Sequence, residues 1–96
     1  MHRALLERRI RDVHARLVRA REDLAVLDEQ LAVVMESADE ARVRSLVAET
    51  PLAAHEHSEA ARHADAMAKA REALAGTVTD LEHRQDELLA DVAGAS

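Results

Sequence analysis

Residues 6–38, LERRIRDVHARLVRAREDLAVLDEQLAVVMESA, repeat an apolar side chain every three or four positions without interruption. A strict alternation of these two spacings keeps one stripe of a helix facing a partner helix in a left-handed coiled coil. We therefore predict a long first helix, over about residues 3–36, that packs along a second one. The predicted interaction seam of this helix consists of Leu6, Ile10, Val13, Leu17, Ala20, Leu24, Leu27, Leu31, Val34 and Ala38.

The second half of the chain keeps the same spacing with smaller and more polar residues. It predicts a second helix over residues 51–92. Polar side chains at seam positions cost stability, but they fix the register of the two helices. The second seam consists of Ala60, Ala64, Met67, Arg71, Leu74, Val78, Leu81, Gln85, Leu88 and Val92, with His57 at the preceding seam position.

The segment between the halves contains two signals for a helix start. Thr50 followed by Pro51 is typical of an N-cap and a first helical residue. Ser37 followed by Glu40 resembles a capping box, and apolar residues at 43, 46 and 47 leave the phase of the first seam. We therefore expect a kink or a break near residues 37–39, and residues 38–49 either continue the first helix or form a short separate one.

These patterns predict an all-α fold: a long antiparallel helical hairpin, with a short third helix at its tip as an alternative, that assembles into a helical bundle. Residues 1–21 contain seven arginines against two acidic residues, a balance of +5, whereas residues 22–96 contain six basic and seventeen acidic residues, a balance of −11. The antiparallel sense brings opposite charges together along the seam. It places Arg8, Arg9, Arg11, Arg16 and Arg19 beside Asp80, Glu82, Asp86, Glu87 and Asp91.

Both predicted helices also have apolar residues beyond the seam, which one partner helix does not cover. We expect a second copy or a different protein to cover them. On the first helix these are Leu5, Val18, Ala25, Val26, Ala32 and Val33, and on the second Ala54, Ala61, Ala68, Ala75 and Leu89.

Composition argues against several classes of function. The chain has no cysteine and no aromatic residue, so it lacks thiolate chemistry and the stacking surfaces typical of single-strand nucleic-acid binding. Residues 1–11 have no apolar core of a signal peptide, and the apolar run 31–35 is too short to span a bilayer. We therefore expect a cytoplasmic, non-enzymatic protein without a cofactor, and we do not expect binding to nucleic acid or membranes.

One row of polar residues is a candidate metal site. His55, Glu59 and His63 recur every four residues, so they share one face of a helix, and imidazole and carboxylate groups bind zinc.

Three functions follow from the sequence. The first is a self-associating interaction module that acts as a scaffold or adaptor. The second is a regulatory hairpin that docks on a large machine such as RNA polymerase or the ribosome, since residues 36–40 would give it an acidic tip. The third is a metal-linked helical bundle that uses the histidine row.

Overall fold

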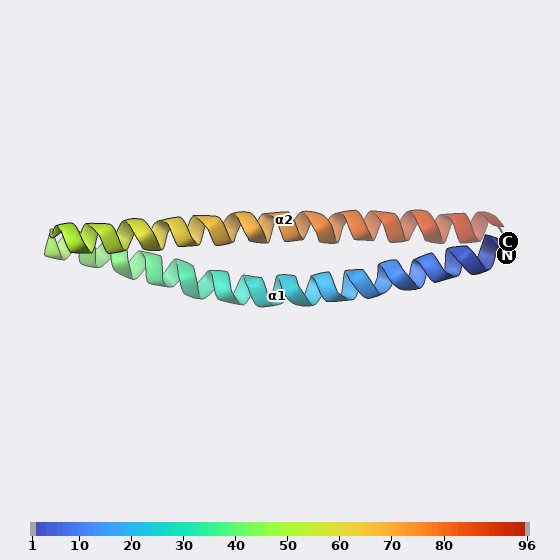
Figure 1. The fold of residues 1–96 in the computed structure, drawn as a ribbon, viewed down its shortest axis with the longest axis horizontal. Coiled ribbons are helices and arrows are strands. Elements are labelled where there is room, and N and C mark those ends of the chain that lie inside the picture. The colour runs from blue at the N-terminus through green and yellow to red at the C-terminus, as the bar shows by residue number, and fades with distance from the viewer. Residues whose placement is uncertain (1, 96) are drawn as a thin grey trace. The chain divides into compact units, whose positions relative to one another are not determined.

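A computed structural model describes residues 2–95, and they form two α-helices (Figure 1). Helix α1 comprises His2–Ala48 and helix α2 comprises Pro51–Ala95. The predicted all-α antiparallel hairpin is confirmed, and no strand occurs within the described residues. Neither helix is long and apolar enough, over residues 2–95, to cross a membrane.

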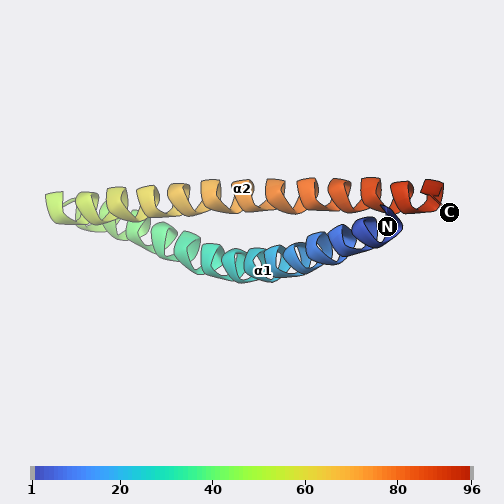
Figure 2. The same ribbon diagram turned by 45° about the vertical axis from the view of Figure 1, so that its right-hand side comes forward.

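The hairpin consists of two structural units, each containing a segment of both helices. The open-end unit comprises Met1–Leu24 with Ala73–Ser96, described for residues 2–24 and 73–95. In it the first turns of α1 and the last turns of α2 lie side by side in both views (Figures 1 and 2). The corner unit comprises Ala25–Glu72 and contains the end of α1, the connection and the start of α2.

The open-end unit has a core of branched aliphatic side chains from both helices. Leu17 and Leu88 are each only 1% exposed, and Ile10, Leu24, Leu74 and Val92 pack against the buried residues from the edges. Burial of apolar area stabilises a fold by roughly 25 cal/mol per Å², so these residues are the main source of stability in this unit. The buried cluster consists of Leu6, Val13, Leu17, Ala20, Val78, Leu81 and Leu88.

The corner between the helices is formed by residues 49 and 50. Glu49 has a φ of 50°, the left-handed conformation that commonly ends a helix, and its N–H donates to the carbonyl oxygen of Ser45 at 3.2 Å. The Thr50 Oγ1 accepts a hydrogen bond from the N–H of Ala53 at 3.2 Å. Pro51 is the first residue of α2, where its missing N–H has no helical partner to lose. The predicted helix start at Thr50–Pro51 is confirmed.

The predicted break near residues 37–39 does not occur, and of the two alternatives for residues 38–49 the structure has the continuation of the first helix and not a separate one. Helix α1 continues through this segment to Ala48. The seam also continues, because Ala38 and Ser45 are half-buried and Ala41 is only 3% exposed. The heptad phase of the seam therefore stays the same over residues 38–45. Small residues occupy the seam here, whereas the larger apolar residues at 43, 46 and 47 are exposed.

Candidate interaction surface

The structure places every large apolar residue of the predicted seam in a buried or half-buried position. In the open-end unit most of them belong to the buried cluster or pack against it. In the corner unit they are half-buried: Leu27, Leu31, Val34 and Met67. The only buried apolar residues of the corner unit, within the described chain, are Ala41 and Ala53.

Two ion pairs connect the helices within the described residues, one in each unit. Arg21 binds Glu82 at 3.2 Å in the open-end unit, and the Arg71 Nε donates to the Asp28 Oδ1 at 2.7 Å in the corner unit. The hydrogen bond to Asp28, together with the charge of that carboxylate, raises the pKa of Arg71. A seam arginine is thus paired with a carboxylate at the edge of the seam.

The charge asymmetry predicted the antiparallel sense and no particular ion pairs, and the structure shows which pairs form. Within the described residues Glu82 binds Arg21, and Glu87 binds Arg84 of its own helix at 3.3 Å. None of Arg8, Arg9, Arg11, Arg16 and Arg19 has an ion pair in this part of the chain. Exposed ion pairs contribute little to stability, so their absence does not conflict with the antiparallel fold.

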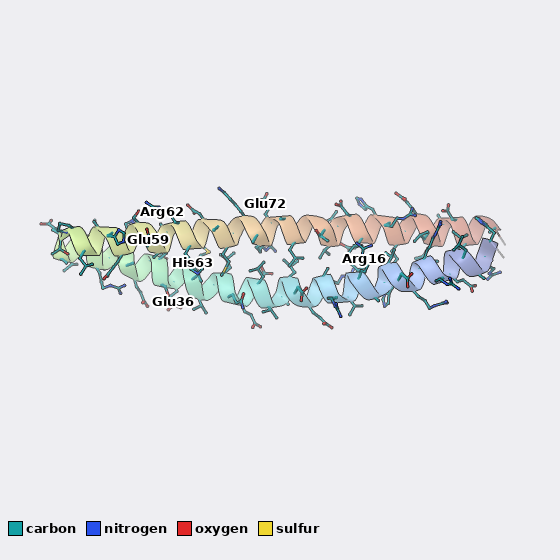
Figure 3. The ribbon with its side chains drawn as sticks, in the orientation of Figure 1. Arg16, Glu36, Glu59, Arg62, His63 and Glu72 are labelled. Carbon is teal, nitrogen blue, oxygen red and sulfur yellow. The ribbon has the colours of Figure 1, made fainter. Side chains whose placement is uncertain are left out.

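The predicted metal row does not form a cluster. His55, Glu59 and His63 are exposed, and the Glu59 carboxylate accepts a hydrogen bond from Arg62 at 3.0 Å. Figure 3 labels Glu59, Arg62 and His63 close together along α2. Residues 2–95 contain no group of three His, Asp or Glu side chains that could hold a metal ion. The metal site stays a prediction and contributes nothing to the proposals below.

The corner unit exposes its large apolar side chains. Val47 is 81% exposed, and Leu46 and Leu52 are each 66% exposed. Three of these exposed residues, Val43, Val47 and Leu52, lie around one hollow, and exposed apolar residues that gather in one place are typical of an interaction site. The exposed apolar set of the unit consists of Val26, Val33, Met35, Val43, Leu46, Val47 and Leu52.

Part of this set surrounds a shallow hollow at the corner, which we call the corner hollow. It has a volume of about 350 Å³ and is lined by the last turns of α1 and the first turns of α2. Its edge carries one basic and one acidic side chain, Arg44 and Glu56, and neither has an ion pair within the described residues. The lining residues are Val43, Arg44, Val47, Ala48, Thr50, Leu52, Ala53 and Glu56.

A second hollow of the corner unit contains a seam histidine. The Nδ1 atom of His57 is buried and has no hydrogen-bond partner. The hollow, about 220 Å³, also contains the charged residues Asp39, Arg42 and Asp65. The small neighbours Ala38, Ala61 and Ala64 leave this space open. A buried polar atom without a partner costs free energy, so the seam is weakened at this point.

The chain matches no known family model, no curated protein and no solved structure. Sequence analysis identified the seam, but it did not find the corner hollow. The sequence left open whether residues 43, 46 and 47 belong to a short separate helix or to a continuation of the first one. The continued spacing of Ala38, Ala41 and Ser45 in the first seam was the available signal that these larger residues would be exposed.

Proposed function

We propose that this protein is a non-enzymatic coiled-coil interaction module that associates with a second copy of itself through the corner unit. The observation that carries the proposal is the position of the apolar residues in that unit. Its seam contains Ala38, Ala41 and Ser45, whereas its valines and leucines outside the seam are exposed. The free energy available from burying these larger side chains is realised only when another protein surface covers them.

The size of the exposed set supports a partner that packs against the helices. Seven large apolar residues of the corner unit are at least 51% exposed, from Val43 at 51% to Val47 at 81%. Full burial of a valine or leucine side chain contributes about 1.5–3 kcal/mol. Coverage of part of this set therefore suffices for a reversible association, even after the entropy cost of association is subtracted.

A helical bundle is the form of assembly that helices with several apolar stripes adopt most simply. Two hairpins supply four helices, and most homo-oligomers are closed and symmetric. In such an assembly the open-end unit of each copy would stay uncovered. It would then be available to bind a further protein, which is the scaffold or adaptor role. We propose a cytoplasmic location, since a chain without cysteine needs no oxidising compartment to fold.

Sedimentation equilibrium over a concentration range from about 5 to 500 µM tests the proposal, because self-association depends on protein concentration. We expect a monomer at the low end and a dimer at the high end. Hydrogen exchange should show that amides of the corner unit gain protection over the same range, whereas those of the open-end unit do not. A monomer at every concentration would exclude the proposed self-association. If such a monomer binds RNA polymerase or ribosomes stoichiometrically, the regulatory hairpin would be favoured instead.

A further inference from the structure

We infer that the corner hollow is a two-fold docking site, in which the corner of one copy packs against the corner of a second copy. The inference rests on the proposed self-association and specifies where it occurs. The hollow combines an apolar floor with a pair of opposite charges, one supplied by each helix: Arg44 lies on α1 and Glu56 on α2.

The charge pattern is what selects a second copy as the occupant. In a two-fold dimer both subunits use the same patch. If residue i of the first subunit faces residue j of the second, then residue j of the first also faces residue i of the second. A two-fold axis through the hollow therefore allows Arg44 of each copy to face Glu56 of the other. Both side chains lack an ion pair within the described residues, so both are free to bind across the dimer.

The apolar residues of the hollow supply the rest of the interface. Val43, Val47 and Leu52 are 51%, 81% and 66% exposed and lie around the hollow from both helices. The corner itself is well ordered by hydrogen bonds, since Thr50 caps α2 and the Glu49 N–H binds Ser45. Docking therefore requires little rearrangement of the backbone, which keeps the entropy cost of association low.

The contact is small, because it involves only the ends of two helices in each copy. Interfaces below about 1,200 Å² in total are typical of weak and transient complexes. We therefore expect a dissociation constant in the range of tens to hundreds of micromolar, and the tests below use protein concentrations that extend above it.

Charge reversal with mixing tests the two-fold arrangement. Arg44→Glu leaves two acidic residues at the hollow, and Glu56→Arg leaves two basic ones. Each variant alone should dimerise at least about tenfold more weakly than the unmodified chain, because like charges then face each other. An equimolar mixture of the two variants should dimerise like the unmodified chain, since every facing pair is again opposite in charge.

The mixture also separates this arrangement from its main alternative, a bond between Arg44 and Glu56 of the same chain. A bond within one chain is lost in both variants, and mixing does not restore it. The double variant with both reversals is uninformative on this point, because it restores either type of bond. Melting curves of the two single variants at low concentration show whether the monomer still folds, since both reversals are also unfavourable to the helix dipoles.

A pair of exposed valines provides a matched test of the apolar contact. Val47 lines the corner hollow and Val33 does not, although both are exposed residues of α1, at 81% and 64%. Their separation of fourteen residues also puts them on the same face of a helix that keeps the heptad repeat. Val47→Ser should weaken dimerisation about tenfold, as expected for the loss of buried methyl groups in both copies, and Val33→Ser should leave it unchanged.

These measurements distinguish failure of the docking site from failure of the proposed function. If the unmodified chain stays a monomer up to about 500 µM, the proposed self-association is wrong and the docking site with it. If it dimerises but the mixture of charge variants does not recover association, or Val33→Ser weakens it as much as Val47→Ser, the corner hollow is not the interface. The module would then associate through another part of the corner unit.

Discussion

The open-end unit and the corner unit follow one heptad repeat but bury different side chains. The open-end seam buries leucines and valines such as Leu17 and Leu88, each 1% exposed. The corner seam buries Ala41 and Ala53 and includes a histidine with an unpaired Nδ1. The repeat determines which face of each helix is turned to the other, whereas side-chain size determines how much stability that contact provides. The predictions below test whether stability is concentrated in the open-end unit.

The largest effect should come from shortening a leucine in each unit. Leu17→Ala removes a fully buried side chain and leaves a cavity, so we expect a loss of about 3 kcal/mol in the free energy of unfolding. Leu31 occupies an equivalent seam position of the corner unit but is only half-buried. Leu31→Ala should therefore cost about half as much. Urea denaturation of both variants at one low protein concentration measures the difference.

The leucine pair is matched, because both residues are in α1 and both substitutions remove the same atoms. Any change in helix propensity is therefore the same in both variants and cancels in the comparison. Equal losses for the two variants would contradict the comparison, since they would show that the corner seam is as stabilising as the open-end seam.

A smaller effect, of opposite sign, should follow from replacing the seam histidine. His57→Leu removes a buried nitrogen atom without a partner and adds apolar surface to the seam. We expect a gain of about 1–2 kcal/mol in the free energy of unfolding. His55 is exposed on the same helix, so His55→Leu is the control and should change stability by less than about 0.5 kcal/mol. A loss of stability in His57→Leu would mean that this imidazole has a partner in solution.

The two predicted helix starts supply the next comparison. The Thr50 hydroxyl binds the Ala53 N–H at 3.2 Å, so Thr50→Ala should cost about 1 kcal/mol. Ser37 lies inside α1, where no helix begins. Ser37→Ala should therefore be neutral or slightly stabilising, because alanine has the higher helix propensity. If Ser37→Ala cost as much as Thr50→Ala, a helix would begin near residue 38 in solution.

Ser37, which resembled a helix start but lies inside α1, illustrates how far the sequence predicts this fold. Spacing was sufficient for the seam and the Thr50–Pro51 corner, because both depend on local geometry that few residues determine. It did not settle residues 38–48, where the larger apolar residues at 43, 46 and 47 lie outside the spacing of the first seam. The structure has Ala38, Ala41 and Ser45 at the seam instead. The corner hollow was missed because Val43 and Val47 come to line it only when the first helix continues to Ala48.

The sequence also did not predict which ion pairs connect the two helices, although it showed the overall charge asymmetry. Long arginine side chains reach several carboxylates with similar free energies, so spacing does not select one partner. Arg21, rather than the neighbouring Arg19, binds Glu82 in the structure. The choice depends on the small rotation of each helix at that point, which a heptad pattern does not specify.

The smallest predicted effect concerns the seam arginine of the corner unit. Arg71→Met keeps most of the aliphatic stem but removes the bond to Asp28, and Asp28→Asn removes the charge of its partner. A double-mutant cycle should give only a small coupling, because both side chains are more than 40% exposed. The coupling should fall towards zero in about 1 M salt, where exposed charges are screened. A large coupling that does not fall in salt would contradict this prediction, because it would show that the pair is buried in solution.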